Sequence, residues 1–124
     1  MSVSEIIIKK KLSKSVYVRP LEDAKANIYF DGDEVWLTLR EIAQLYGVQL
    51  LTVKKHLRNA YKKQKLIEKH VTATLQTTVN DIETTKTVYN MTAITNVGDR
   101  INSALVLKFN EWLDKRKEAR LKKN

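Results

Sequence analysis

The sequence predicts a single domain of the α+β class over residues 1–124. Its 124 residues are 43% hydrophobic, which is enough apolar material for one compact core. One proline and three glycines leave no room for a flexible linker. Short β-rich runs alternate with segments whose apolar residues recur at helical spacing, so strands and helices are expected to alternate along the chain.

The first 37 residues contain four short β-rich runs. These runs are Ile6–Ile8, Ser15–Arg19, Asn27–Phe30 and Val35–Leu37. The first two are expected to form strands around a basic turn, with Val16 and Val18 on one face. Asp31 and Gly32 stand between the last two runs, and an Asp-Gly pair at such a place predicts a β-hairpin.

Thr38 opens the next segment and is expected to cap a helix. Glu41 follows three residues later, as a capping box requires, and Gly47 is placed to end this helix. A second helix is expected from about Leu50 to Lys65. A turn of only a few residues would then join the two helices.

Two threonine-rich strands and a short helix are expected next. The strands span Val71–Val79 and Thr84–Met91, and residues 80–83 form the polar turn between them. Thr92 is expected to cap a short helix that Gly98 ends.

The last predicted helix begins near Ser103. Its apolar residues recur at helical spacing and are expected in the core; they are Leu105, Phe109, Trp112 and Leu113. Residues 114–124 form a basic tail that is almost wholly charged. The final turns of the helix are expected to fray.

The segment from Thr38 to Lys63 has the residue pattern of a helix-turn-helix. Ala43 is small where a second helix would cross the first, and Gly47 suits the left-handed backbone of the turn. The apolar residues that would hold the two helices together are Ile42, Leu45, Tyr46, Val48, Val53 and Leu57. Together these residues indicate a helix-turn-helix more specifically than any one of them does alone.

The second helix of this motif is expected to turn a cationic face to solvent, as a recognition helix in the major groove of DNA does. The candidate DNA-binding residues are Gln49, Leu51, Thr52, Lys54, Lys55, Arg58, Asn59, Lys62 and Lys63. The cations would mainly neutralise phosphates, whereas Gln49, Leu51 and Thr52 would face base edges, together with Lys55. The alternative is an ordinary amphipathic helical hairpin whose cations are merely solvated.

Two arrangements of the whole chain fit this order of elements. The first is a winged helix-turn-helix in which the strands over 71–91 form the wing and the C-terminal helix closes the core. The second is an internal pseudo-dimer of two units, 15–65 and 71–113, each with a β-hairpin and a helix-turn-helix. In that arrangement Gly98 corresponds to Gly47.

The formal net charge of +9 is concentrated in two segments. Residues 38–65 contain seven Lys and Arg against the single acid Glu41, and residues 108–124 contain seven against three acids. Residues 1–37 are balanced. Two basic patches suit a polyanionic partner such as double-stranded DNA.

The residue patterns of catalysis and of metal or cofactor binding are absent from the sequence. It has no cysteine, and His56 and His70 stand 14 residues apart without a metal-binding spacing. No GxSxG, phosphate loop or pair of catalytic acids occurs, so we expect neither an enzyme nor a bound cofactor. The lack of cysteine and of a long apolar run indicates a cytoplasmic protein without membrane contact.

Three sequence blocks occur in a distinctive order. They are DGDEVWLTLREIAQLYGV, TVKKHLRN and VYNMTAITNVGDRINS, and with SEIII, VxVR and KFNEWL they span most of residues 4–113. In this order they resemble the N-terminal domain of the RhuM-like proteins of bacterial mobile elements. The resemblance implies a DNA-binding helix-turn-helix and no catalytic activity.

The chain departs from that family at residues 49–51, at Asp99 and at residues 104–105, so neither base preference nor a second nucleic-acid surface carries over. In size and charge it is also similar to the TraN-type accessory proteins of Gram-positive conjugative plasmids. This similarity implies transcriptional regulation or an accessory role in plasmid conjugation. An adaptor that contacts other proteins of a transfer or recombination complex is the alternative, and the oligomeric state stays open.

Overall fold

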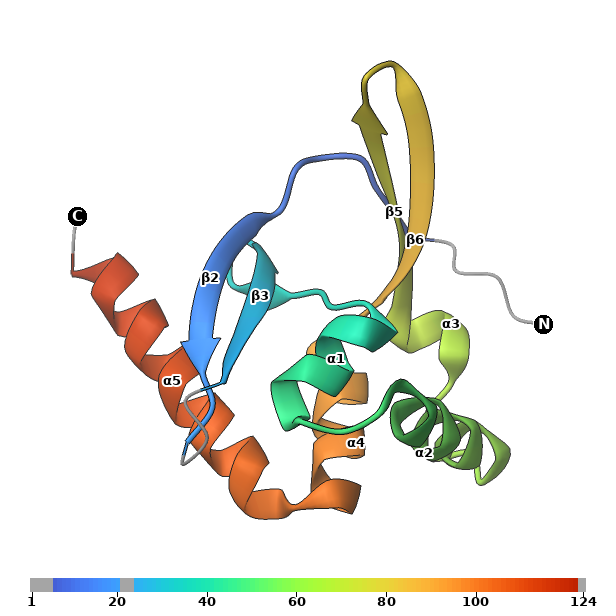
Figure 1. The fold of residues 1–124 in the computed structure, drawn as a ribbon, viewed down its shortest axis with the longest axis vertical. Coiled ribbons are helices and arrows are strands. Elements are labelled where there is room, and N and C mark those ends of the chain that lie inside the picture. Colours follow the sequence, from blue (N-terminus) through green and yellow to red (C-terminus); the bar gives the residue numbers. More distant parts are fainter. Residues whose placement is uncertain (1–5, 21–23, 123–124) are drawn as a thin grey trace.

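The computed structural model describes residues 6–20 and 24–122 and has an α+β fold (Figure 1). Its strands are β1 (Ile7–Ile8), β2 (Ser13–Val18), β3 (Lys25–Asp31), β4 (Glu34–Val35), β5 (Thr72–Val79) and β6 (Ile82–Tyr89). Its helices are α1 (Leu39–Tyr46), α2 (Leu50–Lys62), α3 (Glu68–Val71), α4 (Met91–Ile101) and α5 (Ser103–Leu121). The α+β class predicted from the sequence is therefore confirmed.

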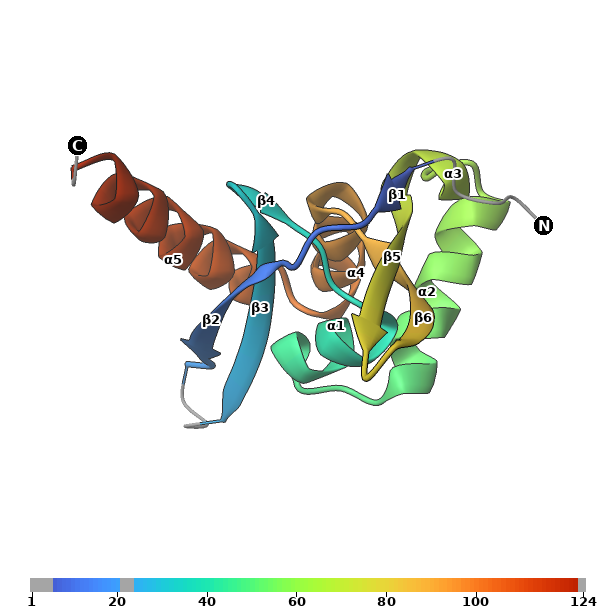
Figure 2. The same cartoon turned by 90° about the horizontal axis from the view of Figure 1, so that it is seen from above.

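The strands form two separate three-stranded sheets, which lie on either side of α1 and α4 (Figure 2). β2, β3 and β4 are antiparallel, and Gly32, at φ +64°, lies in the predicted turn between β3 and β4. In the other sheet β1 runs parallel to β5, with Ile7 opposite Thr74. The predicted pairing of the first two runs around a basic turn is wrong, because residues 9–12 lead from one sheet to the other.

The face shared by Val16 and Val18 on β2 is the exposed one. These side chains are 48% and 49% exposed, whereas Tyr17 between them is buried. The ring of Tyr17 makes edge contacts with Phe109 and Trp112 of α5, at centroid distances of 5.2 Å in both cases. The alternation of a strand thus turns Tyr17 toward the helices.

The β5–β6 hairpin begins one residue later and ends two residues earlier than predicted, and its turn is tighter. Val79 pairs with Ile82, so only Asn80 and Asp81 lie between the strands. Both have positive φ, 52° and 65°, which Asn and Asp tolerate better than other non-glycine residues. The predicted turn over residues 80–83 is therefore wrong in its last two residues. Figure 1 shows the hairpin standing out from the body of the molecule.

α4 differs from its prediction at both ends. Its N-cap is Asn90, whose side chain accepts a hydrogen bond from the backbone N–H of Ala93 at 3.2 Å, so Thr92 does not cap it. Gly98 is buried inside the helix, which continues to Ile101. Each half of the chain does place antiparallel strands before two helices, but Gly98 is not the counterpart of Gly47.

The main core lies where the β2–β3–β4 sheet meets α1, α2, α4 and α5. Phe109 of α5 is fully buried, as predicted, whereas Trp112, Leu105 and Leu113 are half-buried and pack against this core. Burying a side chain such as Phe109 stabilises the fold by about 1.5–3 kcal/mol. A smaller cluster at the base of the hairpin joins Ile8 and Trp36 to Ala73 and Val88.

The C-terminal helix does not fray where its apolar residues end. α5 remains helical to Leu121, and the Arg116 guanidinium lies 3.5 Å from the centroid of the Phe30 ring. Arg116 also donates a hydrogen bond to Ser15 Oγ at 3.2 Å, and Arg120 forms an ion pair with Asp33 at 3.0 Å. These contacts hold the basic helix against the first sheet.

Candidate nucleic-acid interface

α1 begins with the capping box that the sequence predicts. Thr38 Oγ1 accepts a hydrogen bond from the Glu41 N–H at 3.2 Å, and Glu41 Oε1 accepts one from the Thr38 N–H at 2.8 Å. The carboxylate of Glu41, the only acid of residues 38–65, is therefore engaged at the helix N-terminus. It does not neutralise the cations of α2.

Gly47 makes the turn between α1 and α2, as predicted. It has φ +66°, and the Val48 N–H donates to the Ala43 carbonyl at 3.0 Å. A Cβ on Gly47 would lie 2.7 Å from Arg19 Nη1, which itself donates to the Gln44 carbonyl at 2.7 Å. Both the backbone angle and the Arg19 contact therefore favour glycine here.

Arg19 is a structural residue of the site that the sequence analysis missed. Its guanidinium reaches from the end of β2 to a carbonyl in the last turn of α1, 25 residues away in sequence. A cation there interacts favourably with the helix dipole and adds a second donor to the Gln44 carbonyl, which also accepts from the Gly47 N–H at 3.3 Å. No local signal links a strand-end arginine to a distant helix end.

The helical pair α1–α2 is held by packing on the faces predicted to be apolar. Val53, Leu57 and Ala60 of α2 are at most 3% exposed, and Ala43 of α1 is 7% exposed. α4 supports the pair from behind, because the Tyr46 hydroxyl donates a buried hydrogen bond to the Ile94 carbonyl at 2.8 Å. The orientation of α2 is thus fixed by its packing against α1 and α4.

The opposite face of α2 is open. Seven of the nine candidate residues are exposed, namely Gln49, Leu51, Lys54, Lys55, Arg58, Lys62 and Lys63. Thr52 and Asn59 are half-buried at the edges of this face. The helix ends at Lys62 instead of Lys65, and Gln64 adopts φ 59° just beyond it, which reverses the chain.

The cationic face has no acidic neighbour in the described part of the chain. Among residues 6–20 and 24–122, no carboxylate lies within ion-pair distance of Lys54, Lys55 or Arg58, and the same holds for Lys62 and Lys63. These charges are therefore available to an external anion.

The β5–β6 hairpin is tied to the start of α1. Leu37 and Tyr89 exchange two backbone hydrogen bonds, of 3.1 and 2.7 Å, and Leu37 immediately precedes the cap Thr38. Asn90, which follows β6, donates from its side chain to the His70 carbonyl at 3.3 Å. The hairpin therefore has a defined attachment beside the α1–α2 pair.

Tyr46 is expected to make the fold sensitive to alkaline pH. Burial is the largest cause that raises its pKa above 10.0, followed by Asp99 and Tyr17. Because the pKa of Tyr46 is raised in the folded state, its neutral hydroxyl contributes fully to the free energy of unfolding below pH 10.0. This contribution is lost as the pH rises above 10.0. Urea unfolding of the wild type and of Tyr46→Phe should be measured on both sides of this pH. The free energy of unfolding should fall less steeply with pH in the variant than in the wild type. Equal slopes would contradict this role of Tyr46.

No protein-family model, curated protein or solved structure matches this chain. Within the described residues, no three His, Asp or Glu side chains come together as a metal site. No helix in this part of the chain is long and apolar enough to cross a membrane.

Proposed function

We propose that this protein binds double-stranded DNA with α1–α2 as a helix-turn-helix and α2 as the recognition helix in the major groove. One observation carries the proposal: the open face of α2, together with its C-cap Lys63, has five cations without an acidic ion-pair partner among the described residues. The other face of α2 is buried in the core. A rigid helix with a free cationic face fits a groove lined by phosphates.

The residues along α2 have different expected roles. Gln49 and Leu51 lie at its N-terminal end, where recognition helices contact base edges, and Leu51 is 71% exposed. A leucine there can meet a thymine methyl group, and a glutamine can bond adenine. Lys62 and Lys63 at the other end are placed to contact phosphates. Lys55 and Arg58 are placed to contact either a phosphate or a base edge.

The β5–β6 hairpin would act as the wing of this unit. It follows α2 in the chain and is anchored beside α1 by the Leu37–Tyr89 bridge. Asp81 and Glu83 near its tip disfavour close contact with phosphates, so we assign the main affinity to α2. The winged arrangement accounts for the hairpin without requiring a second DNA-binding helix-turn-helix.

The setting of a mobile element follows from the sequence resemblance alone. On that basis the protein would regulate transcription or assist conjugative transfer in the cytoplasm, without catalysis or a cofactor. The exposed Leu51 favours a second candidate, an adaptor that docks α2 on another protein of a transfer complex. The two candidates differ in whether duplex DNA is bound at all.

The test is selection of bound duplexes from genomic DNA, followed by fluorescence anisotropy of the best duplex and of a scrambled one across a salt series. We expect the selected duplex to stay favoured as salt rises. With about five phosphates neutralised, the slope of log affinity against log salt should be about −4.5. An equal loss of affinity for both duplexes as salt rises would mean nonspecific binding. If neither duplex were bound, the adaptor would be favoured.

A further inference from the structure

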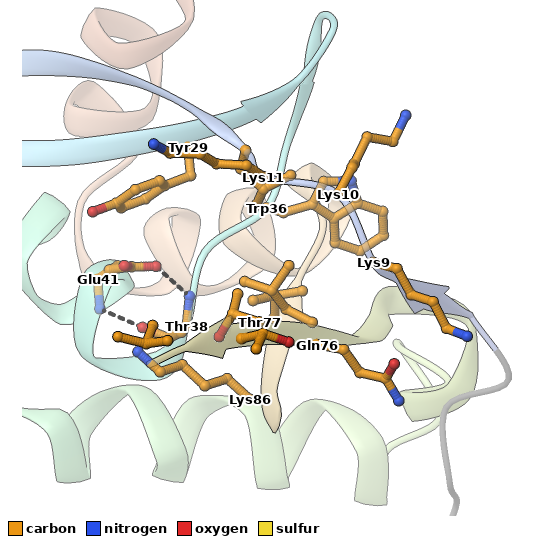
Figure 3. Close-up of a pocket in the computed structure, with 15 residues that line it drawn as sticks. Lys9, Lys10, Lys11, Tyr29, Trp36, Thr38, Glu41, Gln76, Thr77 and Lys86 are labelled. Atoms are coloured by element: carbon orange, nitrogen blue, oxygen red, sulfur yellow. Dashed lines mark hydrogen bonds between the residues drawn. The ribbon is translucent and has the colours of Figure 1, made fainter. Parts of the chain in front are cut away.

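A groove of about 600 Å³ lies between the β5–β6 hairpin, the chain that links β1 to β2, and the start of α1 (Figure 3). Its apolar lining includes Trp36, Leu75 and Val88, which belong to or pack against the smaller hydrophobic cluster. Ligand sites of small molecules usually have 300–1,000 Å³ and mostly apolar walls. The groove thus has the size and lining of a small-molecule site.

The rim of this groove is cationic. Lys9, Lys10, Lys11 and Lys86 line it, against the single carboxylate of Glu41. Lys10 forms an ion pair with Asp31 at 2.9 Å, and Figure 3 shows Lys9 and Lys10 pointing away from the start of α1. The charge balance of the rim favours an anionic occupant.

Two of these lysines flank one end of the groove. Figure 3 shows Lys11 and Lys86 extending toward the end where Thr38 and Glu41 begin α1. Within residues 6–20 and 24–122, neither ammonium group lies within ion-pair distance of a carboxylate. An anionic group placed at this end would lie between two cations while its body lies along the apolar wall.

We propose that the groove binds a small organic anion with an aromatic or aliphatic body. The anionic group lies between Lys11 and Lys86, and the body lies against the wall that Leu75 forms with Val88 and Trp36 behind it. A DNA backbone would neutralise the lysines but has no apolar body to cover this concave wall. The combination of an apolar wall and a cationic end therefore favours an amphipathic small molecule over DNA.

The occupant would touch the hairpin and the start of α1 together. Because it binds only the state in which both are in place, it would stabilise that arrangement. If the proposed DNA binding is correct, such a ligand would regulate it by setting the position of the hairpin beside α1–α2. The binding site itself does not depend on that function.

The test uses the full chain without DNA and the aromatic sulfonate 8-anilinonaphthalene-1-sulfonate as the probe. Thr77→Glu adds a negative charge to a residue that lines the groove, whereas Thr85→Glu adds it to the same hairpin outside the groove lining. Lys86→Gln and Lys117→Gln form a second matched pair, with Lys117 exposed on α5. Circular dichroism checks that all four variants fold.

We expect the wild type to bind one probe molecule with saturation of its fluorescence. Thr77→Glu and Lys86→Gln should each weaken binding at least about fivefold, and their two controls less than about twofold. Equal affinities within either pair would overturn the proposal. The proposal would also be overturned if a random duplex displaced the probe and Thr77→Glu lowered the affinity for that duplex. Both results together would mean that DNA occupies the groove. Failure of the wild type to bind any duplex would overturn the proposed function and leave the groove intact.

Discussion

Replacing Lys55 and Arg58 together with alanine is expected to lower the affinity for the selected duplex by about 10- to 100-fold. Each good base contact contributes about 1–3 kcal/mol of discrimination, and each cation also neutralises a phosphate. Both side chains are exposed on the open face of α2. The change therefore removes charge and base contacts without opening the core. Fluorescence anisotropy at one fixed salt concentration measures the effect.

The matched control removes the same charge from another exposed helix. Lys115 and Lys117 are exposed on α5, and neither has an ion-pair partner in the described residues. Alanine at both positions should lower duplex affinity only slightly, through the loss of net charge. Comparable losses in the two double variants would mean that the protein binds DNA by its overall charge. In that case α2 would have no special role.

Replacing Gly98 with valine is expected to destabilise the fold by about 3 kcal/mol. A Cβ at this position would meet Tyr46 Oη and Val106 Cγ2, both closer than real Cβ contacts allow. Tyr46 is held by its hydrogen bond to Ile94, and Val106 is buried, so neither can move aside cheaply. Overpacking of this kind costs about 1–3 kcal/mol or more, and a β-branched residue adds crowding.

Urea unfolding followed by circular dichroism measures this loss as a lower midpoint at an unchanged slope. Asp99→Val is the control, because Asp99 is the next residue of α4 and is exposed. This variant introduces the same β-branched side chain into the same helix, but at a position where the side chain is exposed to solvent. If the two valine variants were equally stable, the close approach of α1, α4 and α5 at Gly98 would be wrong.

The local parts of the fold were predictable from the sequence. The capping box at Thr38 and Glu41 and the turn at Gly47 depend on residues only a few positions apart, and the structure places them as expected. The open and buried faces of α2 also follow from helical spacing. Short-range chemistry therefore suffices to define the α1–α2 pair.

The mistaken predictions concern contacts between distant segments. Gly98 resembles a helix end in sequence, but it is a glycine because α1 and α5 approach α4 there. β1 pairs with β5 instead of β2, and a two-residue strand carries too little pattern to choose between them. Arg19 reaches the end of α1 only once the β2–β3–β4 sheet packs against that helix.

The groove was not foreseen for the same reason. Its lining comes from the chain around β1, from β3, from the start of α1 and from both strands of the hairpin. No run of sequence contains the cationic end and the apolar wall together. Lys11 and Lys86 are 75 positions apart and line the same groove only through the fold.

The most direct test of the central claim is a titration of the isotope-labelled protein with its selected duplex, followed by backbone amide chemical shifts. If α2 enters the major groove, the largest changes should fall on residues 49–63 and on the turn at Gly47. Amides of β2 and of α5 beyond Trp112 should change little. Shifts centred on α5, or no shifts on α2 at saturating duplex, would contradict the account.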